Sequence, residues 1–276
     1  MSRPIGQPTD PYRAIDAQAD PTEFVERLEE RGETPSHVRL RRRFLRFARV
    51  GRGAAVLEVG SGSGVVARDL ARMVGARGRV VAVDPSRTCV MAARRLARAH
   101  GLDGRIAFRV ADGRRLPFRG GRFDITLAVT VLLHVDEPAA VIGEMVRVTR
   151  RGGIVGVQDQ DFGTLALEHP DRRVTAEILD GVVARLYPEP LSGRRLPGLL
   201  RAAGLDRVRL LTDVYQDTAL APYTQRFLEH RAENAVKFGI VDAATAQHWL
   251  DGITDIARGG RFVMTLTFFG ATGVRP

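Results

Sequence analysis

The chain lacks several features that define other classes of protein. It contains a single cysteine, Cys89, so it can form neither an intramolecular disulfide nor a cysteine zinc cluster. Its longest uncharged apolar run, residues 125–135, is too short to cross a membrane. The first 20 residues are rich in proline and charge and have no apolar core, which argues against a signal peptide. We therefore expect a soluble cytoplasmic protein without a membrane partner.

Lysine is almost absent, and this changes how the net charge is interpreted. The 276 residues include 42 basic and 32 acidic side chains, a net charge of +10, yet Lys237 is the only lysine. A basic balance can indicate a nucleic-acid partner. The arginines are scattered, however, and those at positions 39, 42, 43 and 46 encircle one predicted helix without interleaved aromatic residues. A nucleic-acid partner is therefore not favoured.

Short apolar runs alternate with helical stretches between residues 51 and 158. Strands are predicted at residues 55–59, 79–83, 106–110, 123–129 and 154–158, and two more at residues 207–211 and 261–269. Continuous apolar strands separated by helices are typical of a mainly parallel sheet that is covered on both faces. The predicted fold class is therefore α/β, with a Rossmann-like doubly wound sheet.

A glycine-rich turn follows the first predicted strand. Glycine tolerates positive φ and has no Cβ, so a ligand can lie against the backbone at Gly60, Gly62 and Gly64. The helix that follows offers unpaired N–H groups. The dinucleotide fingerprint GxGxxG would need a small residue at Val65, and Glu58 precedes the first glycine. The spacing favours a nucleoside cofactor without a pyrophosphate; the alternative is a tight turn without a ligand.

Acidic residues follow the next two predicted strands. Asp84 ends the second strand 20 residues after Gly64, where a carboxylate can accept hydrogen bonds from both ribose hydroxyls. Asp84 could instead cap the next helix. After the third strand, Asp112 can bond an adenine amino group while Ala111 leaves room for the ring. The alternative for this pair is an Asp-Gly turn.

Together these segments resemble the class I S-adenosylmethionine-dependent methyltransferases. Residues 123–135 and 147–153 are similar to the subgroup that contains the ubiquinone/menaquinone-biosynthesis and many small-molecule methyltransferases. The resemblance covers about residues 52–160. It implies a seven-stranded sheet with an antiparallel last strand, S-adenosylmethionine as cofactor and S-adenosylhomocysteine as product. The expected enzyme methylates O, N or C of a small organic metabolite, in secondary-metabolite (natural-product) or quinone-type biosynthesis.

The resemblance also implies a role for individual residues. Gly60, Ser61, Gly62 and Gly64 would pass the methionine and ribose, with Glu58 supporting the loop. Asp84 would hold the ribose. The remaining implied cofactor contacts are Pro85, Ser86, Ala111 and Asp112 around the adenine, and Val129 and Thr130 beside the methionine.

Catalytic residues are harder to identify, because a sulfonium methyl is already activated and the enzyme must mainly align the nucleophile. His134 follows the fourth strand and could take a proton from the acceptor. Asp159 and Asp161 follow the fifth strand and could orient or deprotonate substrate, or simply cap a loop. No metal site is expected. An RNA- or protein-directed methyltransferase and a non-methylating cofactor binder remain as alternatives.

The segments outside the cofactor core are expected to determine the substrate. Residues 1–50 form a predicted N-terminal arm with helices at residues 21–31 and 36–50, and residues 51–276 form the main domain. Helical insertions are predicted near residues 161–204 and 218–260. In small-molecule members of the family such additions form a lid. The alternative is an interface in a homo-oligomer, with the arm exchanged between subunits.

Overall fold

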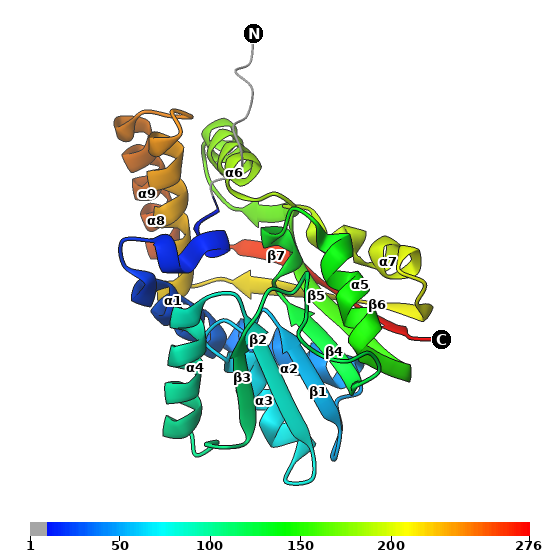
Figure 1. Cartoon of the computed structure of the whole chain (residues 1–276). Helices are drawn as coiled ribbons and strands as arrows, with labels where there is room; N and C mark the ends of the chain where they lie inside the picture. The colour runs from blue at the N-terminus through cyan, green and yellow to red at the C-terminus, as the bar shows by residue number, and fades with distance from the viewer. Residues whose placement is uncertain (1–9) are drawn as a thin grey trace.

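A seven-stranded sheet forms the centre of the computed structural model, which describes residues 10–276 (Figure 1). The strand order is β3-β2-β1-β4-β5-β7-β6. Strands β1 to β5 pair in parallel, and β7 is antiparallel to both β5 and β6. The predicted doubly wound sheet with an antiparallel last strand is thus confirmed. The strands are β1 Ala55–Val59, β2 Arg79–Asp84, β3 Ile106–Val110, β4 Phe123–Val129, β5 Thr149–Leu167, β6 Asp206–Asp217 and β7 Met264–Val274.

Strand β5 is much longer than the apolar pattern predicts. It pairs with β7 from Ile154 to Leu167, with Asp159 opposite Phe269 and Asp161 opposite Thr267. Four consecutive polar residues, 158–161, interrupt the apolar run here, so the sequence pattern ends the strand too early. The consequence is that Asp159 and Asp161 are strand residues and do not belong to a loop after the strand.

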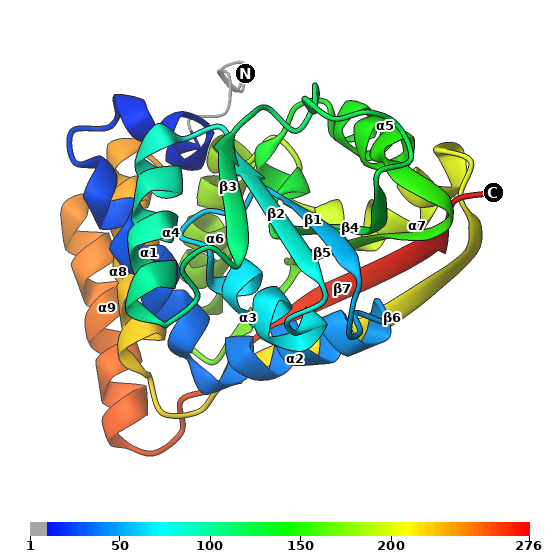
Figure 2. The same ribbon diagram turned by 60° about the horizontal axis from the view of Figure 1, so that its bottom comes forward.

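Helices cover both faces of the sheet (Figures 1 and 2). Helices α2, α3 and α4 share one hydrophobic core with the first face, and α5 and α7 share another core with the second. Phe44 and Leu45 of α2 are fully buried, as are Leu196 and Leu200 of α7. These two helices therefore pack directly against the sheet, whereas the predicted boundaries assign them to the arm and to an insertion; the boundaries themselves stay a prediction. The covering helices are α2 Pro35–Phe47, α3 Val65–Val74, α4 Arg87–Ala99, α5 Pro138–Val148 and α7 Ser192–Ala202.

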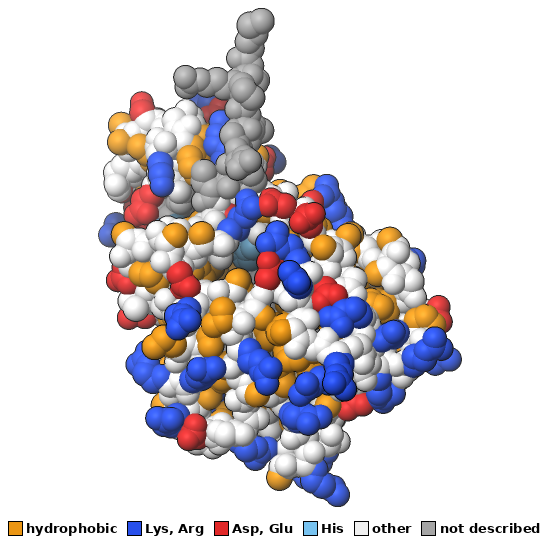
Figure 3. Space-filling model, in the orientation of Figure 1, with side chains coloured by type: hydrophobic (Ala, Val, Ile, Leu, Met, Phe, Trp, Pro, Cys, Tyr) orange, Lys and Arg blue, Asp and Glu red, His pale blue; other side chains and the backbone are white. Residues whose placement is uncertain are grey.

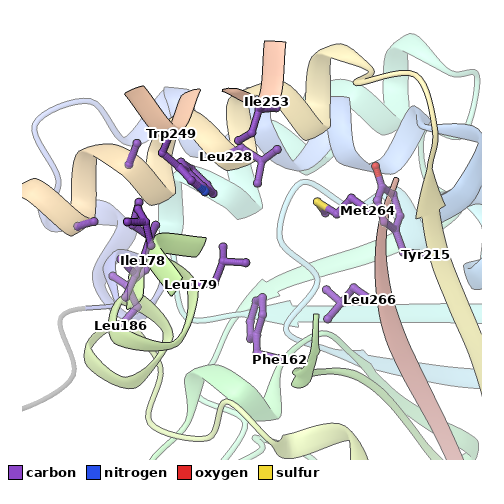
Figure 4. Close-up of a cluster of buried hydrophobic side chains, with 14 of the residues drawn as sticks. Phe162, Ile178, Leu179, Leu186, Tyr215, Leu228, Trp249, Ile253, Met264 and Leu266 are labelled. Carbon is purple, nitrogen blue, oxygen red and sulfur yellow. The ribbon is translucent and has the colours of Figure 1, made fainter. Parts of the chain in front are cut away.

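Three helices pack together beyond the cofactor core, and their hydrophobic cluster continues into β5, β6 and β7. We call α6 Arg172–Leu186, α8 Pro222–Lys237 and α9 Ala243–Arg258 the lid helices. Figure 4 shows Ile178, Leu228 and Trp249 pointing toward one another from these three helices. The Trp249 indole N–H donates to the Thr175 hydroxyl at 3.0 Å, which satisfies the one polar atom of this buried ring. The lid is therefore held together mainly by apolar burial.

The described part of the N-terminal arm packs against its own chain. It consists of the short helix η1 Pro11–Ala17 and helix α1 Pro21–Glu33. Asp16 accepts hydrogen bonds from the Ser86 hydroxyl at 2.6 Å and from the Arg87 N–H at 2.8 Å, at the start of α4. A carboxylate is favourable at this position because of the helix dipole. The arm thus lies across the edge of the sheet where the parallel strands end (Figure 2).

Candidate cofactor and substrate site

The glycine turn after β1 is shaped by close contacts. Gly60 has φ +72°, and an added Cβ would lie only 2.4 Å from Val131 Cγ2. The N–H groups of Gly60 and Ser61 donate to the Val83 carbonyl at 2.8 and 2.9 Å, which fastens the turn to β2. Only glycine fits at position 60, because it avoids both the steric clash and the cost of positive φ.

Gly64 has a different role in the same turn. It precedes α3 with φ +83°, and an added Cβ would lie 3.0 Å from Ala93 Cβ and 3.1 Å from the Phe108 ring. Gly64 lines neither cavity described below. The structure therefore assigns it to the close packing of the turn against α4 and β3, which does not support the predicted cofactor contact.

Two adjoining cavities lie at the edge of the sheet where β1 and β4 end. This is the point at which the strand order reverses, where open α/β sheets bind their ligands. The larger cavity has a volume of 510 Å³ and extends from the glycine turn to α8. The smaller has a volume of 110 Å³ and lies against Glu58, Ser61 and Gln158. Both are lined by Gly60, Gly62, Thr130 and Arg31.

The smaller cavity is surrounded by buried polar atoms without partners. Within residues 10–276, Glu58 Oε2, Ser61 Oγ and Gln158 Nε2 have no hydrogen-bond partner. Burial, and secondly the Asp84 carboxylate, raise the pKa of Glu58 well above its ordinary value. Unpaired buried polar atoms cost folding free energy, so this cluster is suited to a ligand that carries both donors and acceptors.

Asp84 ends β2 and lines the larger cavity. Its two carboxylate oxygens accept from the Gly62 N–H at 2.7 Å and the Ser86 N–H at 2.9 Å. A carboxylate offers about four acceptor sites, so two remain for a ligand. Burial raises the pKa of Asp84, and the two N–H groups oppose that effect. The carboxylate can therefore fix the glycine turn and still accept bonds from two hydroxyls.

The residues predicted around the adenine separate into two groups. Pro85 and Asp112 line the larger cavity, and Asp112 also forms an ion pair with Arg114 at 2.7 Å. Ser86 instead caps α4: its hydroxyl accepts from the Cys89 N–H at 3.1 Å and donates to Asp16. Ala111 packs with the core of the sheet. Neither Ser86 nor Ala111 lines either of these two cavities, so the geometry does not support these two contacts.

Arg31 of α1 is a site residue that the sequence analysis missed. Its Nη2 donates to Thr130 Oγ1 at 3.0 Å and its Nε to His37 Nε2 at 3.2 Å. Burial, followed by the charges of Arg31 and Arg41, lowers the pKa of His37 well below its ordinary value, so His37 is neutral. Arg31 forms no ion pair within residues 10–276, and residues 1–9 contain no acidic side chain. The cavities thus meet at an uncompensated guanidinium.

Thr130 has an unusual backbone conformation. Its φ is +57°, which is rare for a β-branched residue. Its N–H donates to the Gln158 carbonyl at 2.7 Å, and its hydroxyl accepts from Arg31. Backbone strain of this kind concentrates at functional sites. Val129 beside it lines the smaller cavity.

His134 lies in the short helix η2 Leu132–His134 and lines the larger cavity. Its Nδ1 pairs with the carboxylate of Asp10, which is buried. The rings of Tyr12 and Tyr187 lie 5.2 and 5.7 Å from the imidazole. The sequence pointed to His134 but not to Asp10, because nothing in the irregular arm indicates where its side chains go. Together the two residues form a His–Asp pair at the cavity wall.

Asp159 and Asp161 lie elsewhere. Successive strand residues point to opposite faces, so Gln160 lines the larger cavity and Gln158 the smaller, whereas the two aspartates face α7. Asp159 accepts from the Leu133 N–H at 3.0 Å and the Ser192 hydroxyl at 3.1 Å, and Asp161 pairs with Arg194. Burial raises the pKa of Asp159 to about 6. The geometry does not support a catalytic role for either aspartate; both fasten the start of α7.

The far half of the larger cavity is lined by aromatic rings. We call this part the aromatic chamber; it lies between β7, the arm and helix α8 of the lid. The rings of the aromatic chamber belong to Tyr12, Tyr187, Tyr215, Tyr223, Phe227 and Phe268.

Two features are absent from the part of the chain that the structure describes. Within residues 10–276, no helix is long and apolar enough to span a membrane, and no three His, Cys, Asp or Glu side chains are grouped so that they could hold a metal ion.

Comparisons with known proteins identify the domain that contains this site. A family model described as a methyltransferase domain matches residues 56–153. A solved structure, described as that of a putative methyltransferase from Bacillus halodurans, superposes with a TM-score of 0.57 at 18% identity, covering 86% of this chain and 98% of that one. Residues 56–153 form a methyltransferase domain, and the sheet has the class I methyltransferase fold. S-adenosylmethionine is the cofactor of this domain, as the resemblance of the glycine turn and Asp84 implies.

Two curated relatives match longer stretches of the chain than the family model does. An uncharacterised protein of transposon TN4556 from Streptomyces fradiae is 30% identical over 79% of this chain and 61% of its own length. Methyltransferase GfsG of Streptomyces halstedii is 33% identical over 61% of this chain and 58% of its own. The ubiquinone/menaquinone C-methyltransferase of Idiomarina loihiensis is 32% identical over 38% and 42%. The chain therefore spans about three fifths of the length of the first two relatives.

Most of the sequence-predicted cofactor positions gather in the methyltransferase domain around the two cavities, and their contact with the cofactor stays a prediction. Three of them, Gly64, Ser86 and Ala111, do not line either cavity. The positions that line one or both cavities are Glu58, Gly60, Ser61, Gly62, Asp84, Pro85, Asp112, Val129 and Thr130.

Proposed function

We propose that the chain transfers a methyl group from S-adenosylmethionine to O, N or C of a small organic molecule. The single observation that carries this proposal is the shape of the larger cavity. It extends without interruption from the glycine turn and Asp84 to the aromatic chamber beneath α8. A cofactor and a small acceptor can therefore meet inside one cavity that the arm and the lid helices cover.

The polar groups suggest how the cofactor lies. The methionine end would occupy the smaller cavity, where the unpartnered Glu58 Oε2 and Ser61 Oγ can accept hydrogen bonds from its amino group. Gln158 Nε2 and Arg31 can donate to its carboxylate. Asp84 would accept bonds from the ribose hydroxyls. The adenine would then extend toward Pro85, Gly113 and Asp112. Each polar part of the cofactor thus meets a group of opposite hydrogen-bonding character.

A proton acceptor is present beside the expected reaction point. The sulfonium of the cofactor supplies the activated methyl group. His134 faces the cavity, and its Nδ1 is held by the buried Asp10 carboxylate, which leaves Nε2 to take a proton from a hydroxyl, amine or carbon acid. Asp10 would stabilise the imidazolium that results. We therefore propose His134 as general base and Asp10 as its positioning residue.

The aromatic chamber favours an organic acceptor such as a secondary metabolite or a quinone-type precursor. Flat aromatic walls bind planar, partly apolar molecules. The alternative of an RNA substrate has weaker support. Two arginines of α2 are paired, Arg41 with Asp69 at 2.7 Å and Arg43 with Asp213 at 3.2 Å. Arginines on the face shown in Figure 3 are scattered and do not gather in one patch.

A labelling experiment tests this proposal. The purified chain is incubated with S-adenosylmethionine that carries a tritiated methyl group, together with separate small-metabolite, RNA and protein fractions of a cell extract. We expect label in the small-metabolite fraction, and much less there with the Asp84→Ala variant at a subsaturating cofactor concentration. Label that enters RNA or protein instead would contradict the proposed substrate class.

A further inference from the structure

A second uncompensated arginine lies at the far end of the larger cavity. Arg231 of α8 is only 3% exposed and lines this cavity. Its Nη2 donates to the Tyr187 hydroxyl at 3.2 Å, whereas its Nε has no hydrogen-bond partner within residues 10–276. A guanidinium carries five N–H donors, so most of its capacity is not used by the protein.

Aromatic rings surround this guanidinium. Its carbon lies 4.5 Å from the centre of the Phe227 ring, 5.0 Å from Phe162 and 5.4 Å from Tyr187. Cation–π contacts of this kind compensate part of the cost of burying a charge. They do not occupy the edge of the guanidinium plane, where the N–H groups point and where the Tyr187 hydroxyl is the one acceptor within residues 10–276.

No acid of the described chain neutralises Arg231. Asp10 and Glu30, which line the same cavity, pair with His134 and Arg226. Glu233, two residues further along α8, pairs with His230 at 2.9 Å. Residues 1–9 contain no acidic side chain. A buried charge without a partner is costly, and proteins retain one where a ligand supplies the opposite charge. His230 Nε2 is also buried without a partner and lines the same cavity, so two neighbouring groups lack a ligand atom.

The cofactor does not account for this arginine. Arg31 lines both cavities beside the glycine turn, where the methionine carboxylate is expected. Arg231 lines only the larger cavity and belongs to the lid, among the rings of the aromatic chamber. A ligand at Arg231 would therefore be the acceptor molecule.

We propose that the acceptor substrate is a planar anion whose oxyacid group binds Arg231. This inference rests on the proposed function and names the substrate class. The planar guanidinium can form two parallel hydrogen bonds to an oxyacid group, a bidentate geometry that a lysine ammonium cannot provide. The ring system of the acceptor stacks against Tyr187 and Phe227, and its opposite end lies toward His134.

The test is a calorimetric titration of the chain saturated with S-adenosylhomocysteine. The probes are benzoate, benzenesulfonate and phenylphosphonate, with benzamide as the neutral counterpart of the same size. We expect at least one anion to bind roughly tenfold or more tightly than benzamide, which is the gain in affinity expected from one hydrogen bond between charged groups. Comparison of the three anions identifies the oxyacid group that the site prefers.

Variants assign the preference to Arg231. Arg231→Met should abolish the difference between anion and amide, and Arg231→Lys should retain only part of it. Arg173→Met is the matched control, because Arg173 is an exposed lid residue paired with Glu177. All variants should bind S-adenosylhomocysteine like the native chain, which shows that they fold.

Two results would overturn the inference: no anion preference in the native chain, or a preference that survives in Arg231→Met. Failure to bind S-adenosylhomocysteine would refute the proposed function instead, so the two failures are distinguishable.

Discussion

Replacement of Arg31 by methionine should weaken the binding of the methionine end of the cofactor and leave the binding of its adenosine end unchanged. Nε and Nη2 of Arg31 donate to His37, Thr130 and Gln160, all of which are neutral, so its positive charge is available to a ligand. Loss of a charged hydrogen bond at this half-buried position costs about 2 kcal/mol. This corresponds to a roughly 30-fold weaker affinity for S-adenosylhomocysteine.

A truncated ligand makes the measurement specific. 5′-Methylthioadenosine has the adenosine and the sulfur but lacks the amino acid, so its affinity for Arg31→Met should equal that for the native chain. Isothermal titration of both ligands gives the ratio directly. Arg27→Met is the control, since Arg27 is one turn earlier on α1, lines the same cavity and pairs with Glu23.

The reasoning would be refuted by either of two results. One is an unchanged affinity of Arg31→Met for S-adenosylhomocysteine. The other is an equal loss for both ligands, which would mean that the substitution disturbs the site as a whole and that Arg31 does not bind the carboxylate.

Three further predictions concern stability and catalysis. Gly60→Ala should cost about 1–3 kcal/mol more in denaturant unfolding than Gly53→Ala, because both glycines have positive φ but only Gly60 faces a clash; equal costs would contradict this. Burial raises the pKa of Asp159 from 3.8 to about 6, so the folded state binds that proton more tightly. As the pH rises from 4 to 7, the free energy of unfolding of the native chain should therefore fall by up to about 3 kcal/mol relative to that of Asp159→Asn. Identical pH profiles of the two proteins would contradict this. His134→Asn should lower kcat roughly 100- to 10,000-fold with the acceptor found by labelling, while S-adenosylhomocysteine binding persists; unchanged kcat would remove His134 from catalysis.

The local part of the site could be predicted from the sequence. The glycine turn and Asp84 follow strands whose apolar runs are distinct, and parallel strands bring their carboxyl ends to one edge of the sheet. These residues are therefore placed by the order of the strands alone. The class of fold follows from the same alternation of strands and helices.

The other part depends on tertiary contacts that leave no local signal. Arg31 and Arg231 lie on amphipathic helices among many other arginines, and only the packing of α1 and α8 over the sheet shows that they face a cavity. Asp10 becomes a partner of His134 because the arm folds back. The sequence pattern predicts that Asp159 and Asp161 follow the fifth strand, whereas β5 continues through this polar stretch and strand alternation turns both side chains away from the cavity.

Binding of S-adenosylhomocysteine tests the central claim most directly. Calorimetric titration of the native chain should show one site per chain, no measurable binding of NAD, and an affinity weakened by about 1–3 kcal/mol in Asp84→Ala, which lacks the ribose acceptor. Absence of binding by the native chain, or a preference for NAD, would contradict the account.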